Sequence, residues 1–242
     1  MQFGALIVAA GMSSRMGEFK PMLNIGSISI AQRIVATLRQ SGVTRIVMVT
    51  GHNARELEHH LANNGLIFLR NEQYRTTQMF DSAKIGLEYL KDKCDGILFT
   101  PVDIPLFTAS TVSALMDCGA RLVCPVCEGR RGHPILIGTE LVDTILTYCG
   151  EGGLGGAIEH CGAEMTEIAV EDSGILHDAD TPEDYRALLS YHNRQLVRPI
   201  INVELAKEKV FFDRKIAMLL TLVEETNSVR SACPVSYTHL RA

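Results

Sequence analysis

The sequence predicts an α/β fold with a mostly parallel central sheet. Short apolar runs alternate with segments whose apolar residues recur at helical spacing, from residue 5 to about residue 190. Such alternation is typical of βαβ units with right-handed crossovers. Glycines and charged residues follow the first apolar run, and an acidic residue follows a later one. Because ligands bind beyond the carboxyl ends of the strands in open α/β sheets, the same pattern indicates a candidate site at that edge.

The first half of the chain alternates regularly between predicted strands and helices. The helix over 28–40 is the clearest, because Ile30, Ile34, Val35 and Leu38 share one face and Gly42 follows its end. The strands are short apolar runs, as expected of strands buried on both faces. We predict strands at 5–8, 45–50, 66–69 and 97–99, and helices at 28–40, 54–62 and 79–91.

The second half departs from strict alternation. We predict helices at 109–118 and 183–191 and strands at 122–126, 135–137 and 165–170. The strand at 135–137 is expected to be inserted over the carboxyl edge of the sheet. Five glycines within Gly150–Gly156 favour a loop over a site. Before the last helix, Thr181 is the expected N-cap and Pro182 takes the first helical position.

The composition limits the class of protein. Hydrophobic residues make up 46% of the 242 residues, which suits one α/β domain with an appendage. The net charge of −5 argues against broad nucleic-acid coating, although a small basic patch could still bind DNA. No apolar run approaches the roughly 20 residues that span a bilayer. Because Met1 leads straight into the first strand without a signal peptide, we expect a cytoplasmic protein with no membrane partner.

The seven cysteines are scattered and form no disulfide framework, which fits a reducing compartment. Cys124 and Cys127 make a lone C-x-x-C without a second pair at zinc spacing. We interpret them as small buried residues at a strand end, with a redox or metal role as the alternative.

The segment from Ala9 to Lys20 predicts a polyphosphate-binding loop. It follows the first strand directly and combines glycines, small hydroxyls and two cations. Backbone amides in such a loop form an anion-binding concavity, and Arg15 and Lys20 add positive charge. The loop has neither the G-x-x-x-x-G-K-[ST] nor the G-x-G-x-x-G spacing of the two common nucleotide fingerprints. A glycine turn with surface charges is the alternative interpretation.

Acidic residues at two further places predict a Mg²⁺ site at the same edge. Asp103 follows the strand at 97–99, and Asp178 and Asp180 precede the last helix. Mg²⁺ usually binds one or two carboxylates together with substrate phosphates. Asp178 and Asp180 are two residues apart, so an extended segment puts both on one face. The alternatives are a turn-forming role for Asp103 and, for the other two, acids at a helix N-terminus.

The reaction indicated by these residues needs no covalent nucleophile. Neither a Ser/His/Asp order nor an activated cysteine is evident, and His133, in a Gly-His-Pro motif at a strand entrance, has both a structural and a functional interpretation. An attacking phosphate monoester, with a second pKa of about 6, is largely a dianion at pH 7 and needs no general base. Arg15, Lys20, the loop amides and a metal on Asp103 would position the anions and stabilise the departing pyrophosphate.

Four motifs together resemble the molybdenum cofactor nucleotidyltransferases. They are A-A-G-x-S-S-R-M-G-x-x-K from Ala9, the strand-tip Asp103, the Gly-His-Pro around His133 and D-A-D-T-P-E-D from Asp178, spread in order over about residues 3–190. The resemblance implies a Rossmann-like nucleotidyltransferase fold. It also implies transfer of a nucleoside monophosphate from an NTP to the molybdopterin phosphate, with Mg²⁺ as cofactor and release of pyrophosphate. Handover of the product to a molybdoenzyme or its chaperone would follow.

The resemblance also assigns roles to individual residues. Three of them, Arg15, Lys20 and Asp103, would be catalytic. The nucleotide-binding residues would be Ala9, Ala10, Gly11, Ser13, Ser14, Arg15 and Lys20. The substrate-facing residues would be Gln78, Ser82 and His133, and the metal ligands Asp103, Asp178 and Asp180.

The nucleotide is expected to be CTP. Cytidylyl members of the family resemble the Ala9-Ala10-Gly11 of this chain, whereas guanylyl members tend to show Ala-Gly-Gly. Two positions depart from the cytidylyl pattern: Val102-Asp103-Ile104-Pro105 stands in place of Gly-Asp-Gln-Pro, and Gln78 replaces a glycine. Guanylyl transfer to the same cofactor and NTP transfer to a sugar or polyol phosphate are therefore the alternatives within the enzyme class.

The C-terminal region has a different pattern. We predict a transferase domain over 1–190, a linker over 191–209, a partial helix-turn-helix over 210–233 and a non-native tail over 234–242. The segment 211–233 resembles the opening of the winged helix-turn-helix of molybdate-responsive regulators, and its stripe runs through Phe212, Ile216, Leu219, Leu220 and Val223. The recognition helix is absent, so we expect no specific DNA binding. A nucleotide-sensing DNA-binding regulator is the alternative from another class.

Overall fold

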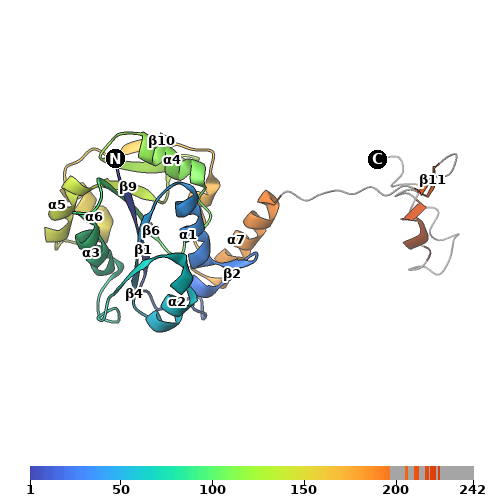
Figure 1. The fold of residues 1–242 in the computed structure, drawn as a ribbon, viewed down its shortest axis with the longest axis horizontal. Coiled ribbons are helices and arrows are strands. Elements are labelled where there is room, and N and C mark those ends of the chain that lie inside the picture. The colour runs from blue at the N-terminus through green and yellow to red at the C-terminus, as the bar shows by residue number, and fades with distance from the viewer. Residues whose placement is uncertain (197–204, 207–209, 213–215, 218, 222, 224–242) are drawn as a thin grey trace. The chain divides into compact units, whose positions relative to one another are not determined.

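The computed structural model describes residues 1–196, 205–206, 210–212, 216–217, 219–221 and 223. The chain forms two units, Met1–Gln195 and Leu196–Ala242. The first unit carries the sheet, with helices on both of its faces (Figure 1). Among the described residues, no helix is both long and apolar enough to cross a membrane.

The central sheet has eight strands and is mostly parallel, as predicted. Its order is β10-β7-β9-β6-β1-β4-β5, and β8 pairs with β7. The strands are β1 (Phe3–Ala9), β4 (Arg45–Thr50), β5 (Ile67–Arg70), β6 (Gly96–Pro101), β7 (Leu122–Cys127), β8 (Arg130–Arg131), β9 (Ile135–Gly138) and β10 (Thr166–Ala169). A small separate hairpin joins β2 (Asn24–Ile25) to β3 (Ile28–Ser29).

The strand predicted over the carboxyl edge lies inside the sheet instead. β9 is inserted between β6 and β7 and runs antiparallel to both. All four of its residues, Ile135–Gly138, are buried, because both of its edges and both of its faces are covered. This burial explains the correction: a continuous apolar run is better accommodated in the middle of a sheet than over its edge.

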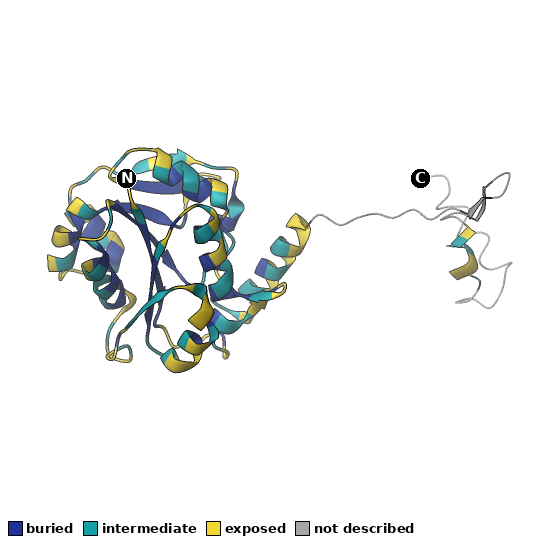
Figure 2. Cartoon of the chain, viewed as in Figure 1, coloured by how far each residue is buried: buried dark blue, intermediate teal, exposed yellow. Residues whose placement is uncertain are grey.

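The helices cover two separate hydrophobic cores, one on each face of the sheet. In β1, Ala5 and Ile7 pack into one core, while Leu6 and Val8 pack into the other. The buried sheet between the two helical layers is visible in Figure 2. The first core takes residues of α1 (Ile30–Gln40), α2 (Ala54–His60), α4 (Ala109–Asp117) and α7 (Pro182–Gln195). The second takes residues of α3 (Met79–Leu90), α5 (Val142–Thr147) and α6 (Gly153–His160).

The glycine-rich segment is shorter as a loop than predicted. Helix α6 begins at Gly153, so the second half of Gly150–Gly156 is helical. Gly152 and Gly153 enter the helix with φ of 88° and 59°, a conformation that glycine adopts at little cost. Burial of Leu154 and Ile158 in the second core stabilises the helix. Tertiary packing therefore outweighs the low helix propensity of the glycines.

Two smaller predictions are confirmed. Cys124 and Cys127 are buried in β7, and they pack into different cores on opposite faces of the sheet, which is not an arrangement for a shared bridge or metal. Thr181 caps α7: its Oγ1 accepts from the Asp184 amide at 3.2 Å, while the Asp184 carboxylate accepts from the Thr181 amide at 2.9 Å.

The structure corrects the predictions for the C-terminal region at those residues that it describes. Helix α7 continues to Gln195, so 191–195 belong to it rather than to a linker. In the second unit, β11 (Leu205–Ala206) pairs antiparallel with β12 (Val210–Phe212), so Phe212 lies in a strand and not in the helical stripe. Residues 216–217, 219–221 and 223 are helical. The remainder of the predicted helix-turn-helix and the predicted non-native tail lie outside the described residues.

Candidate active site

The site forms where β1 and β6 end side by side. Val8 of β1 is in register with Pro101 of β6, and the Val102 amide donates to the Val8 carbonyl at 3.0 Å. The segment beginning at Ala9 and the turn carrying Asp103 therefore leave the sheet together at its carboxyl edge. The Ala179 amide, in turn, donates to the Asp103 carbonyl at 3.0 Å, which brings the segment before α7 to the same place.

The loop after β1 is held open by its backbone conformation. Ser13 and Gly17 have φ of 52° and 77°, both in the left-handed region. The Ser13 hydroxyl accepts from the Lys20 amide at 3.3 Å, which closes the base of the loop. Gly11 is exposed, and a Cβ placed on it would meet no atom within 4 Å. The loop is thus an open backbone surface above the end of β1.

Four charged side chains meet at the carboxyl edge of the sheet. Lys20, whose side chain is only 10% exposed, donates from Nζ to Asp180 at 2.6 Å and lies 3.7 Å from the Asp103 carboxylate. Arg15 approaches the other Asp180 oxygen at 3.0 Å from solvent. The structure thus brings four predicted site residues together, although they come from three distant parts of the chain. Ser14 and Asp178 are exposed and lie outside these contacts.

The two carboxyl groups of this cluster differ in their environment. Burial raises the pKa of Asp103, and the charges of Asp180 and Asp178 act in the same direction, while Lys20 opposes them. The hydrogen bond from Lys20 lowers the pKa of Asp180, assisted by the charges of Lys20 and Arg15. Because its carboxylate is the harder of the two to keep charged, Asp103 has more to gain from an additional cation.

Asp103 and Asp180 fit a divalent cation that is shared with substrate phosphates. In the part of the chain that is described, no group of three or more histidine, cysteine, aspartate or glutamate residues could hold a metal ion. Mg²⁺ is usually held by one or two carboxylates when substrate phosphates complete its shell. Asp103 and Asp180, which both lie beside Lys20, could supply these two carboxylates. Bound there, the cation would neutralise phosphate charge as a Lewis acid.

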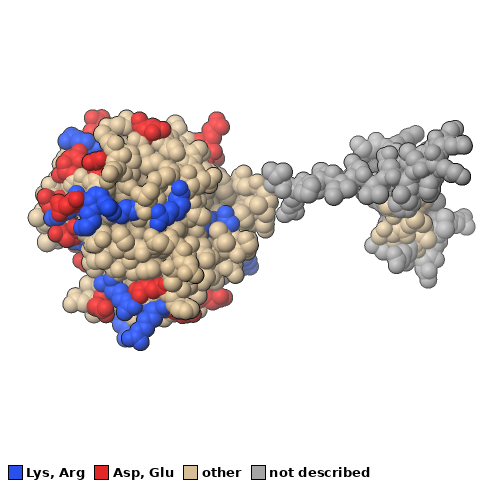
Figure 3. Space-filling view, in the orientation of Figure 1, with Lys and Arg blue, Asp and Glu red and all other residues tan. Residues whose placement is uncertain are grey.

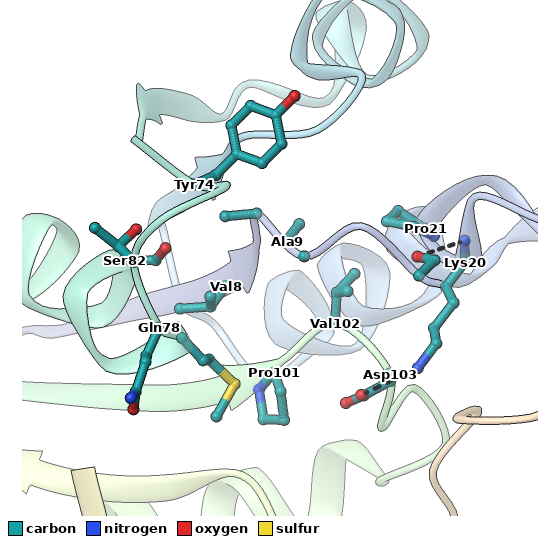
Figure 4. A pocket seen from close by; sticks show the side chains of 15 residues that line it. Val8, Ala9, Lys20, Pro21, Tyr74, Gln78, Ser82, Pro101, Val102 and Asp103 are labelled. Carbon is teal, nitrogen blue, oxygen red and sulfur yellow. Dashed lines mark hydrogen bonds and ion pairs between the residues drawn. The ribbon is translucent and has the colours of Figure 1, made fainter. Parts of the chain in front are cut away.

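A cleft of about 160 Å³ opens from this cluster along the ends of β1 and β6 (Figure 4). Eight of the predicted site residues line it: Ala9, Ala10, Gly11, Ser13, Lys20, Gln78, Ser82 and Asp103. Ser82 is buried and accepts from the Asn71 side chain at 2.9 Å. This arrangement places the predicted substrate-facing Gln78 and Ser82 in the same cleft as the predicted polyphosphate-binding loop.

The sequence interpretation missed two residues that line the cleft, Tyr74 and Thr77. A Cβ on Gly51 would lie 2.7 Å from the Tyr74 Cβ and 2.8 Å from the Ala10 carbonyl oxygen, so glycine lets these segments approach. Their place in the chain, directly after a strand, was the signal that could have identified these residues. The segment follows β5, and the Asn71 amide donates to the Thr50 carbonyl at 2.8 Å, so it too starts from the carboxyl edge.

His133 lines a neighbouring cavity rather than the charged cleft. That cavity measures about 540 Å³ and shares Gln78 and Met79 with the first. Burial lowers the pKa of His133 to about 4, so its ring is neutral at pH 7. The site is thus a charged cleft with an uncharged histidine next to it.

Comparison with known proteins identifies the family of the chain. The family described as MobA-like NTP transferase domain matches residues 5–165 of the chain. The chain belongs to this family. As a MobA-like NTP transferase, it is similar to the molybdenum cofactor cytidylyltransferase of Escherichia coli, with 27% identity over 183 residues that cover 74% of this chain and 92% of the relative.

Other relatives of the MobA-like domain are longer. The bifunctional protein GlmU of Staphylococcus haemolyticus is 30% identical over 119 residues, 48% of this chain, and the match spans only 26% of GlmU. Solved structures share the fold. A nucleotidyl transferase from Methanothermobacter thermautotroptrophicus superimposes with a TM-score of 0.72 at 20% identity, over 81% of this chain and 99% of that one. A manganese complex of Rv0371C from Mycobacterium tuberculosis gives a TM-score of 0.66 at 20% identity, over 78% and 99%.

Proposed function

We propose that this MobA-like NTP transferase moves CMP from CTP to the phosphate of the molybdenum cofactor and releases pyrophosphate. The observation that carries the proposal is the cluster of Lys20, Asp103 and Asp180 beside an open backbone loop. Such a cluster suits a triphosphate with a divalent cation and offers no nucleophile of its own. Similarity to the cytidylyltransferase of Escherichia coli over 92% of its length favours CTP and this acceptor.

In the proposed reaction, an oxygen of the acceptor phosphate attacks the α-phosphorus of CTP. The bond between that phosphorus and the oxygen leading to the β-phosphate breaks, and pyrophosphate leaves with the electron pair. The acceptor is already a dianion near pH 7, so no side chain has to remove a proton. Lys20, Arg15 and the loop amides would bind the triphosphate charge, and Asp103 and Asp180 would hold Mg²⁺, which would neutralise phosphate charge. The product would then pass to a molybdoenzyme or its chaperone.

Pyrophosphate release with each of the four NTPs tests the proposal. The full chain is incubated with Mg²⁺ and molybdenum cofactor, and we expect release with CTP to exceed release with GTP at least tenfold. Replacing the cofactor by glucose 1-phosphate should reduce release to background. Turnover with GTP but not CTP would contradict the assignment of CTP as the nucleotide. Turnover with glucose 1-phosphate but not with molybdenum cofactor would contradict the assignment of the acceptor.

A further inference from the structure

Asp172 is a buried charged residue that the transfer described above does not use. It lies between β10 and α7 and is only 5% exposed. Its carboxylate accepts four hydrogen bonds: from the Thr108 amide at 2.8 Å, the Thr108 hydroxyl at 2.9 Å, the Thr111 hydroxyl at 2.6 Å and the Gly174 amide at 3.1 Å. A buried carboxylate is costly unless its hydrogen bonds are made, so these contacts hold Asp172 in one place.

Three of the four hydrogen bonds come from the start of α4. Thr108 is the N-cap of this helix, and its hydroxyl accepts from the Thr111 amide at 3.3 Å. On the next turns, Val112 and Leu115 are fully buried in the first core. A negative charge is also favourable at a helix N-terminus. Asp172 therefore ties the segment before α7 to a helix that is itself anchored in the core.

The segments that follow β6 and β10 run past each other in opposite directions. At one end, the Ala179 amide donates to the Asp103 carbonyl at 3.0 Å. In the middle, Gly174 lies so close to Leu106 that a Cβ on it would be 2.0 Å from the Leu106 carbonyl oxygen. At the other end, Asp172 binds the start of α4. The two segments are thus paired along their length, and Asp172 closes the end that is remote from the charged cluster.

This pairing determines where Asp180 stands relative to Asp103. Asp180 directly follows Ala179, and the two carboxylates lie 2.6 and 3.7 Å from Lys20 Nζ. A slip of one residue in an extended segment moves it by about 3.3 Å and turns its side chains to the opposite face. Mg²⁺ requires near-ideal octahedral geometry with ligands at about 2.0–2.1 Å. A slip would therefore separate the two proposed ligands of the cation.

We infer that Asp172 is a positioning residue: it fixes the register of the two segments and thereby the affinity of Asp103 and Asp180 for a small divalent cation. The inference rests on the proposed function, which assigns the cation to this pair of carboxylates. Asp172 lines neither the charged cleft nor the cavity beside it. It would therefore act only through the segment that it holds, as residues that orient metal ligands do.

Binding of Mn²⁺ alone to the full chain tests the inference, because the electron paramagnetic resonance signal of free Mn²⁺ falls as the ion binds. We expect wild type to bind Mn²⁺ and Asp103→Asn to lose this binding, which locates the ion. Asp172→Ala should bind Mn²⁺ about tenfold more weakly or worse, because all four hydrogen bonds are lost. Asp172→Asn can still accept from the Thr108 amide and should lose less affinity than Asp172→Ala.

Two further variants separate positioning from stability. Ser29→Ala is the matched control, since Ser29 is buried and caps α1 by accepting from the Gln32 amide at 3.2 Å, but belongs to neither segment. Loss of this cap should lower the melting temperature and leave Mn²⁺ affinity within about twofold. Thr111→Val removes only the 2.6 Å bond to Asp172 and should weaken Mn²⁺ binding about threefold, which keeps the test valid if Asp172→Ala does not fold.

Mn²⁺ binding by folded Asp172→Ala within twofold of wild type would overturn the inference, as would an equal loss in Ser29→Ala or a wild type that binds no Mn²⁺. If only Thr111→Val folds, binding like wild type in that variant has the same meaning. These results are independent of turnover. The expected pattern of binding without any pyrophosphate release by wild type would support the positioning role and remove the proposed function. Release by Asp172→Ala with the same half-maximal Mg²⁺ concentration as wild type would keep the proposed function and remove the positioning role.

Discussion

At the scale of single residues, Lys20 determines the electrostatics of the site. It is almost fully buried, and it joins two carboxylates that come from the turn after β6 and from the turn before α7. A buried cation of this kind is stable only while its partners are present. The cluster therefore holds three chain segments together, and in the proposed function it also provides charge for an anionic substrate.

Asp103→Asn should reduce pyrophosphate release by about 100-fold or more, because in the proposed function it removes a metal ligand and with it several kcal/mol of charge stabilisation. The fold should be retained, since Asp180 still pairs with Lys20. Asp143→Asn is a matched control, because Asp143 is 83% exposed and pairs with Lys91 on the surface. Initial rates and thermal melting of the three proteins provide the measurement. Wild-type activity in Asp103→Asn would remove this residue from the metal site.

His133 should make the protein less stable in acid. Its pKa in the folded chain is about 4, below the 6.5 of an unperturbed histidine. Between these values the unfolded chain binds the extra proton, so stability is lost as the pH falls from 6.5 towards 4. From pH 7 to pH 5, wild type should lose about 2 kcal/mol more free energy of unfolding than His133→Phe. Urea denaturation at both pH values measures this difference, and identical losses in the two proteins would show that His133 does not titrate in this way.

The charged half of the site could be predicted from residue types, and the apolar half could not. Lys20, Asp103 and Asp180 carry their chemistry in the side chain, and each follows or precedes a recognisable element. Tyr74 and Thr77, by contrast, are ordinary residues until folding brings their segment against Ala10 and Gly51. The residues that line this side of the cleft are brought together by tertiary packing, and no local pattern in a single sequence predicts that packing.

At the scale of elements, glycine sets how closely helices approach the sheet. Gly86 in α3 faces β1, and a Cβ there would lie 2.1 Å from Cδ1 of Leu6, which is fully buried. The helix can pack at this distance only without a side chain. The strands, β9 included, and the longer helices were predictable from periodicity, but the place of β9 within the sheet and the helicity of α6 were not. The direction of a short apolar run and the helicity of a glycine run are decided by what they pack against.

Gly86→Val should therefore destabilise the fold by about 1–3 kcal/mol, the usual cost of overpacking. Gly155→Ala is the control in a second helix, where a Cβ has free space, and it should cost nothing or stabilise slightly. Urea denaturation at pH 7 compares both with wild type. Equal stability of Gly86→Val and wild type would mean that α3 can move away from β1 at little cost.

At the scale of the whole molecule, the candidate site belongs entirely to the first unit. All residues that line the two cavities lie between Val8 and Met165, and the charged cluster adds Asp180. The first hydrophobic core extends to Leu189 and the second to Met165. Positive and negative side chains are interspersed on the face of this unit seen in Figure 3, in keeping with the modest net charge of −5.

A chain that ends at Gln195 should consequently fold and keep its activity. The deletion removes no residue of either core and none of the cluster around Lys20, so we expect a melting temperature within about 3 °C of the full chain, a shift equivalent to less than 1 kcal/mol. Pyrophosphate release should stay within twofold. Gel shift with random DNA at fixed salt, run on both chains, should give equally weak binding. Loss of activity on truncation, or tight DNA binding by the full chain only, would assign a role to the second unit. Either result would favour a DNA-binding regulator over an enzyme whose second unit has no role.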